Sequence, residues 1–298
     1  MTAAQVPALR DALVRRLAGT LHSTLRVSEE SRALRRAPAS MDVYAMTLRA
    51  IALKHRYNPA DSAEARRLLE QVVAIDPQYA PGWAHLGMVN AVAWALRFDG
   101  PQRPEAIHEA VAQIERGVAL DPALSASYLG LSFAYPFAGR LDDGLRAGRR
   151  CMELAPSDAD CMMLLAVHLS YAGDTREAIE LSDRAMATSP LPPAFMNNYR
   201  AHTLWTVGRL DEAIAAYDAC LQQAPGFVMG RAWRMLTLAE AGRLDAARAD
   251  HEIVRRGLHG DSVADWVRGR FGPRAGALAQ RRLAALRQVE PLPALAAR

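Results

Sequence analysis

The chain has 298 residues, of which 51% are hydrophobic and 23% are charged, a composition typical of folded proteins and not of disordered ones. No stretch reaches the roughly 20 continuous apolar residues that a membrane-spanning helix needs, and the first residues lack the apolar core of a secretory signal. We therefore expect no membrane association and a cytoplasmic location. The net charge of +4 is uneven, because residues 1–60 carry 10 basic and 4 acidic side chains whereas residues 61–254 carry 17 and 25. A nucleic-acid-binding surface needs a basic face on the folded body, which is acidic here, so no nucleic-acid partner is expected.

Residues 1–40 are predicted to hold one amphipathic helix. Apolar residues recur there three or four positions apart, as at Leu9, Leu13 and Leu17. Because the end of a repeat array needs a cover, we expect this helix to cap the helices that follow it. The alternative is a connector helix through which the chain forms a homodimer.

Two series of residues divide residues 41–261 into repeats. Prolines recur every 34 or 35 residues from Pro122 to Pro225, and glycines recur at the same intervals from Gly139 to Gly242. A glycine can close a helix in the left-handed conformation, and a proline pushes the residue before it out of the helical region. The pattern therefore predicts an all-α solenoid of about six helix pairs, approximately 46–79, 80–124, 125–158, 159–193, 194–227 and 228–261.

The second repeat is longer than the others, with 45 residues between Pro77 and Pro122. We place the insertion near residues 97–105, which are rich in turn-forming and charged residues. The tail, residues 262–298, is predicted to form two short capping helices around Gly272-Pro273, with Leu278, Leu283 and Leu286 as their buried edge.

The segment Trp83-Ala-His-Leu-Gly-Met-Val-Asn90 resembles the opening of the tetratricopeptide repeat, with Asn90 where that family has tyrosine. Ile75-Asp-Pro77 and Leu120-Asp-Pro122 resemble the motif that ends its second helix. The resemblance implies a right-handed superhelix, with the first helix of each pair on the concave face, and a function in binding proteins or peptides.

A second resemblance involves residues 35–49 and 75–84. They are similar to the C-terminal repeat region of bacterial class III adenylate or guanylate cyclases and of winged-helix transcriptional regulators. We find neither the paired metal-binding aspartates of a cyclase head nor a winged-helix pattern in the sequence. This resemblance implies an alternative, in which the chain is the regulatory or oligomerising half of a bacterial signalling system.

The sequence shows no motif for catalysis. It has no Walker loop, dinucleotide fingerprint, HExxH, CxxC or GxSxG pattern. The three cysteines, Cys151, Cys161 and Cys220, are too few and too scattered to predict a disulfide framework or a zinc site, and we expect them to be small buried residues. We therefore expect no catalytic, cofactor-binding or metal-binding residues and a chain that is not an enzyme.

Helical spacing from Trp83 predicts which side chains line a concave groove. The groove is mostly apolar, with Asn198 and His202 as a polar island, and its methionine and aromatic side chains are types that often anchor interfaces. We expect it to bind a protein or peptide segment with apolar or aromatic side chains. The alternative is that these side chains are buried between turns of the superhelix or under the N-terminal helix. The predicted groove residues are Met88, Phe133, Met163, Val167, Phe195, Asn198, His202, Trp205, Met229 and Leu236.

Overall fold

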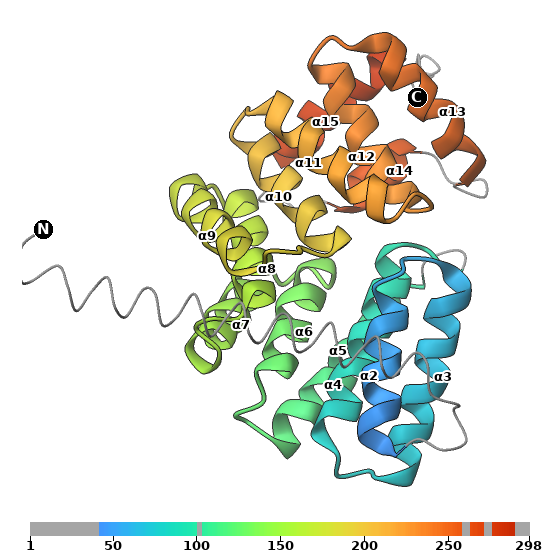
Figure 1. The fold of residues 1–298 in the computed structure, drawn as a ribbon, viewed down its shortest axis with the longest axis vertical. Coiled ribbons are helices and arrows are strands. Elements are labelled where there is room, and N and C mark those ends of the chain that lie inside the picture. Colours follow the sequence, from blue (N-terminus) through green and yellow to red (C-terminus); the bar gives the residue numbers. More distant parts are fainter. Residues whose placement is uncertain (1–41, 100–102, 258–262, 271–275, 290–298) are drawn as a thin grey trace, which may run out of the picture. The chain divides into compact units, whose positions relative to one another are not determined.

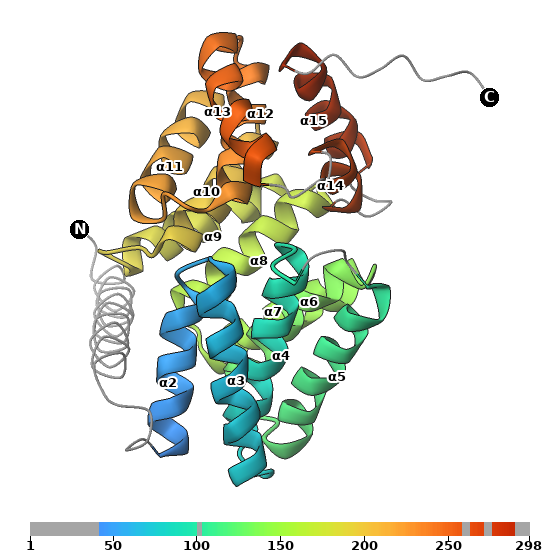
Figure 2. The ribbon, with the colours of Figure 1, turned by 90° about the vertical axis from the view of Figure 1, so that its right-hand side faces the viewer.

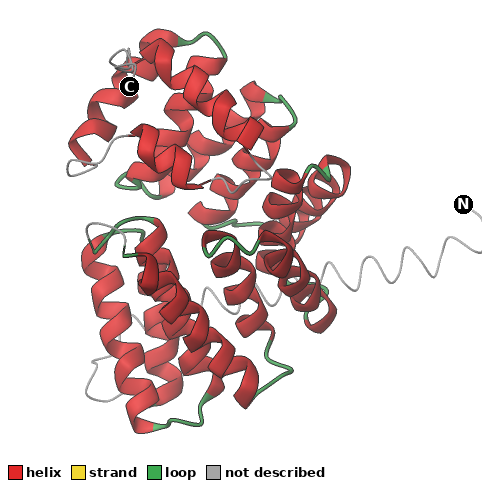
Figure 3. Cartoon of the chain, turned by 180° about the vertical axis from the view of Figure 1, so that it is seen from behind, coloured by secondary structure: helices red, strands yellow, loops and turns green. Residues whose placement is uncertain are grey.

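The structure is a computed structural model that describes residues 42–99, 103–257, 263–270 and 276–289. Within these ranges every regular element is a helix, and short loops join the helices (Figure 3). The helix predicted in residues 1–40 lies outside the described residues.

Twelve of the described helices form the six predicted pairs (Figure 1). The all-α repeat fold that the proline and glycine series predicted is therefore confirmed. The pairs are α2 (Val43–Lys54) with α3 (Pro59–Ile75), α4 (Ala80–Ala95) with α5 (Pro104–Leu120), α6 (Ser125–Phe137) with α7 (Leu141–Leu154), α8 (Ala159–Ala172) with α9 (Thr175–Thr188), α10 (Ala194–Thr206) with α11 (Leu210–Gln223), and α12 (Val228–Glu240) with α13 (Leu244–Gly257).

The described residues divide into two compact units. Unit 1 holds the described residues up to Ala166 together with Glu180–Pro192, and unit 2 holds Val167–Ile179 and the described residues from Pro193 onward. In unit 1, α4 packs against α2 and α6 as well as against its partner α5, so that the first helices of successive pairs are neighbours (Figure 2). Unit 2 ends in two further helices, α14 (Val263–Arg270) and α15 (Gly276–Val289), as predicted for the tail.

The glycine series closes the first helices as the sequence predicted. Gly139, Gly173, Gly208 and Gly242 have φ angles of +76°, +97°, +81° and +74°, in the left-handed region. The residue after each glycine donates its N–H to a carbonyl five residues back, as Arg209 does to Leu204 at 3.0 Å. This bond satisfies a carbonyl that the end of the helix would otherwise leave without a partner.

The proline turns are held by the repeat that follows each of them. At three junctions, a side chain six residues after the proline donates a hydrogen bond to the proline carbonyl oxygen. The pairs are Trp83 Nε1 to Pro77 at 3.0 Å, Tyr128 Oη to Pro122 at 3.1 Å, and Arg231 Nη2 to Pro225 at 3.3 Å.

A buried carboxylate joins α11, α12 and α13 in unit 2. Asp250 is 3% exposed and accepts hydrogen bonds from Arg231 Nη1 at 3.0 Å and from Arg234 Nη1 at 2.6 Å. Arg234 also donates from Nε to Asp218 at 2.5 Å. The two guanidinium groups therefore compensate the cost of burying the Asp250 charge.

Candidate partner-binding surface

Most of the predicted groove residues are buried in this structure. Met88 and Phe195 are half-buried and offer part of their surface to solvent. That the ten predicted groove residues contact a partner stays a prediction. The buried members are Phe133, Met163, Val167, Asn198, His202, Trp205, Met229 and Leu236.

In unit 2, helix α15 covers part of the surface on which the groove was predicted. Helix α12 is buried almost all round, which is typical of a helix covered on opposite sides. Its neighbours include α11, α13 and α15. Side chains of α15 contact α10 and α11 as well as α12, so this helix covers more than the last pair.

The contact between α15 and the repeats centres on Arg282, which is fully buried. Its guanidinium carbon lies 3.6 Å from the centroid of the Trp205 ring and 5.1 Å from that of Trp233, within the range of a cation–π interaction. Its Nη1 donates to the hydroxyl of Thr237 at 2.7 Å, and its Nη2 to the hydroxyl of Tyr217 at 3.3 Å. The guanidinium therefore sits in a socket built from α10, α11 and α12.

The hydrogen-bond partners of Arg282 are neutral, and the carboxylate of Glu240 acts on it only through space. Burial lowers the pKa of this guanidinium, and its buried Nε has no hydrogen-bond acceptor among the described residues. A buried donor without a partner costs about 1–3 kcal/mol. The socket thus holds a cation at a free-energy cost that an apolar side chain would avoid.

A second, more exposed contact lies beside the socket. The carboxylate of Glu240 accepts a hydrogen bond from Trp205 Nε1 at 2.6 Å and another from Nε of Arg281, the residue before Arg282. The Arg281 guanidinium lies 4.7 Å from the Trp205 ring centroid. Because its side chain is 31% exposed, this ion pair is partly screened by solvent.

His202 connects the socket to an aromatic cluster in unit 2. Its Nδ1 lies 3.0 Å from the hydroxyl of Tyr171, and its ring packs edge-on against Tyr217 and Trp233. Burial raises the pKa of Tyr217, so its hydroxyl stays protonated and can donate or accept a hydrogen bond. Helical spacing predicted His202 and Trp205 in one groove, but Tyr217, Trp233 and Arg282 were not predicted. The arginine at a buried position of an otherwise apolar helix face was the signal for the last of these.

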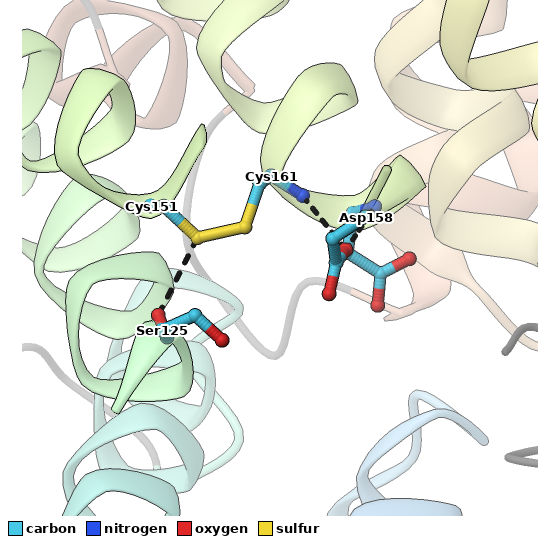
Figure 4. Close-up of a disulfide and its surroundings, with 5 residues drawn as sticks. Ser125, Cys151, Asp158 and Cys161 are labelled. Atoms are coloured by element: carbon cyan, nitrogen blue, oxygen red, sulfur yellow. Dashed lines mark hydrogen bonds between the residues drawn. A yellow bond between two sulfur atoms is a disulfide. The ribbon is translucent and has the colours of Figure 1, made fainter. Parts of the chain in front are cut away.

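The expectation that the three cysteines stay unpaired was wrong for two of them. In unit 1, Cys151 near the end of α7 and Cys161 near the start of α8 form a disulfide, with their Cα atoms 5.8 Å apart (Figure 4). The turn between the two helices brings them together, and Asp158 caps α8 by accepting from the N–H of Cys161 at 3.2 Å. Cys220 is free and buried, as expected. Because disulfides are rare in the cytosol, the cytoplasmic location stays a prediction.

A polar cavity of about 350 Å³ lies beside the predicted insertion in unit 1. The described part of this insertion connects α4 to α5, and Trp94 Nε1 bonds across it to the carbonyl oxygen of Arg103 at 2.8 Å. Asn90, which replaces the family tyrosine, accepts from Arg66 Nε at 2.7 Å and donates to Gln113 at 2.8 Å. The cavity is lined by side chains of both charges, among which Arg66 pairs with Asp99 and Arg103 lies 3.9 Å from Glu109.

Among the described residues, no group of three or more histidine, cysteine or carboxylate side chains is placed to hold a metal ion. Of the helices in the described ranges, none has the length and apolarity that crossing a membrane would require.

The comparisons with known proteins agree with the helix pairs. The family model described as tetratricopeptide repeat matches residues 198–227, which cover most of α10 and all of α11. The structure also resembles TTC0263, a thermophilic TPR protein of Thermus thermophilus, with a TM-score of 0.50 and 20% identity over 70% of this chain and 98% of that one. The chain therefore contains a tetratricopeptide repeat and has the fold of tetratricopeptide-repeat proteins.

Two other similar proteins are informative. Human IFIT1, solved as a dimer with m7Gppp-AAAA, has a TM-score of 0.57 at 15% identity, over 85% of this chain and 60% of that one, which shows a shared fold alone. The protein named "Putative adenylate cyclase 3" of Rhizobium meliloti (strain 1021) is 27% identical over 140 residues, or 47% of this chain. The matched region spans only 24% of that curated relative. Tetratricopeptide and other repeat solenoids bind their partners on extended surfaces.

Proposed function

We propose that this chain is a non-catalytic scaffold that binds a segment of another protein along the first helices of its repeats. The observation that carries the proposal is the seating of α15 on α12, with Arg282 against Trp205 of α10. A separate helix thus already lies on the first-helix surface of unit 2. The apolar groove residues predicted from the sequence belong to the same set of helices.

The experiment is an affinity capture of the full chain from its native cells, followed by a binding measurement with the purified partner. Met88→Ala and Phe195→Ala change half-buried first-helix side chains without emptying the core. Each is expected to weaken binding about tenfold, in the range of interface anchors.

Ile75→Ala is the matched control, because Ile75 is an apolar side chain that is 66% exposed at the end of a second helix. It should leave the affinity unchanged. Equal losses for all three variants, or none for Met88→Ala and Phe195→Ala, would reject first-helix binding.

The second candidate function is the regulatory or oligomerising half of a bacterial signalling system. The similarity to the protein named as an adenylate cyclase favours it, since that match covers a minor part of a much longer protein. If the chain oligomerises, sedimentation of the full chain should show a mass that rises with concentration. A monomer at every concentration would reject the oligomerising role, and with it the homodimer predicted through residues 1–40.

A further inference from the structure

Helix α15 has the pattern of a segment that docks into a groove. Its buried side chains include Ala279, Arg282, Leu283 and Leu286, at positions i, i+3, i+4 and i+7 of one helix face. Amphipathic helices that lie in hydrophobic grooves of other proteins use the same spacing for their anchors. On the opposite face, Gln280, Ala284 and Arg287 are exposed.

The groups that receive Arg282 all belong to the repeats. The Trp205 ring comes from α10, the Tyr217 hydroxyl from α11 and the Thr237 hydroxyl from α12, with donor-to-acceptor distances of 3.3 Å to Tyr217 and 2.7 Å to Thr237. Because these groups come from the repeats and not from α15, the repeats can present the same groups to an arginine of another helix. An aromatic ring with flanking hydroxyls is suited to a planar guanidinium, which stacks and donates in its plane.

The chemistry of the contact also makes α15 replaceable. A helix whose only task is to cover apolar surface would be held more firmly by a leucine than by a buried cation whose hydrogen-bond partners are neutral. Beside Arg282, the Arg281–Glu240 ion pair is partly exposed and therefore weakened by salt. A surface that exchanges one helix for another must bind the first helix weakly enough to release it.

We propose that Trp205, Tyr217 and Thr237 form an arginine socket for a helix of a partner protein, and that α15 occupies it as an intramolecular competitor. This inference rests on the proposed scaffold function and names the chemistry of its ligand. The partner helix carries an arginine three residues after a small residue, followed by leucines, as in Ala279-x-x-Arg282-Leu283-x-x-Leu286 of α15. Binding of the partner and docking of α15 exclude each other.

The test measures binding of a fluorescent peptide with the sequence of residues 276–289 to the full chain, by anisotropy. The receptor is the chain with Arg282→Ala and Leu286→Ala, which weakens its own α15. This receptor should bind the peptide at least tenfold more tightly than the wild-type chain does. A peptide carrying Arg282→Gln should bind the same receptor at least tenfold more weakly, as should the wild-type peptide when Trp205→Leu is added to the receptor.

Equal affinity of the arginine and glutamine peptides would overturn the socket. If the receptor variant loses helicity, the test is instead hydrogen exchange of the wild-type chain with and without the peptide. Excess peptide should then speed exchange of the α15 amides at least tenfold while α10–α13 stay protected, and unchanged α15 exchange would reject displacement.

A wild-type dimer that Arg282→Ala abolishes would assign the socket to a second copy of the chain and overturn the proposal of a separate partner. A chain that binds its captured partner through Met88 and Phe195 but not the peptide rejects the socket alone, whereas failure of both rejects the scaffold function.

Discussion

The Arg282 guanidinium carbon lies 3.6 Å from the centre of the Trp205 ring, so that a residue of the last described helix stacks on the first helix of the fifth pair. The two residues are 77 positions apart in the chain. Helical spacing predicted Trp205 in the groove, but it did not predict that Arg282 is buried. Only the tertiary structure shows that the two side chains meet.

Substitutions of Arg282 should distinguish what its size and its charge each contribute to the free energy of unfolding. Arg282→Met keeps an unbranched apolar side chain in the socket, and we expect the free energy of unfolding to stay within about 1 kcal/mol of wild type. Arg282→Ala removes the packing on Trp205 and should cost about 3 kcal/mol. Urea denaturation of both variants measures the difference. A loss in Arg282→Met as large as in Arg282→Ala would mean that the charge itself stabilises the fold.

Asp250 should be a strong determinant of unit 2 stability. Asp250→Ala leaves the half-buried guanidinium groups of Arg231 and Arg234 without this carboxylate, and we expect a loss of about 1.5–3 kcal/mol, the range for hydrogen bonds to charged groups. Asp245→Ala is the control, because Asp245 pairs with Arg248 on the open surface and should matter by less than about 0.5 kcal/mol. Thermal unfolding of the two variants checks the contrast, and similar melting temperatures would contradict it.

The glycine turns can be tested with a matched pair. Gly208 has a φ of +81°, and no atom lies within 4 Å of the position that a β-carbon would occupy, so Gly208→Ala adds backbone strain without a clash. We expect a loss of about 1–2 kcal/mol. Gly226→Ala is equally uncrowded but lacks a positive φ, and it should be neutral or slightly stabilising. Chemical denaturation that ranks the two variants the other way would show that the left-handed turn is not what matters.

The disulfide predicts how many cysteine thiols can be alkylated before and after reduction. Without reductant, the unfolded chain should be alkylated only at Cys220, and after reduction at Cys151 and Cys161 as well. Intact mass spectrometry distinguishes one modification from three. For so short a loop, the chain-entropy model predicts that Cys151→Ser costs about 2–3 kcal/mol under oxidising conditions. The same variant should cost less in reductant, and an equal cost in both would mean that the bond does not stabilise the native state.

Alkaline pH should destabilise unit 2 through its buried thiol. Burial raises the pKa of Cys220 from an ordinary value of 9.0 to about 12. A raised pKa means that the stabilising effect is complete below pH 9 and is lost as the pH rises toward 12, because the unfolded chain ionises first. This group alone accounts for up to about 4 kcal/mol over that window. The unfolding free energy of Cys220→Ala should therefore fall less steeply above pH 9 than that of wild type, and parallel curves would contradict the assignment.

The helix pairs could be predicted from the sequence because their signals are local. A glycine that ends one helix and a proline that ends the next act within a few residues, and the left-handed φ of Gly208 follows from that position alone. Helical spacing also assigns Trp205 to the face of its first helix on which the groove was predicted, and its role in binding stays a prediction. What covers that face in unit 2 does not follow from spacing, because periodicity within α10 carries no information about a helix some seventy residues later.

The cysteine pairing was missed for a different reason. Cys151 and Cys161 are separated by 10 residues, a spacing that matches no metal or disulfide motif. They meet because one lies in the last turn of α7 and the other in the first turn of α8. A search for cysteines on both sides of each proline turn would have found them.

The hydrogen bonds from Trp83, Tyr128 and Arg231 to the carbonyls of preceding prolines bear on where the chain can be cut. A fragment that stops at one of these prolines removes the donor on which its final turn depends. Truncations for crystallisation or for mapping a minimal fragment should therefore extend through the first helix of the next pair, so that the last junction is complete.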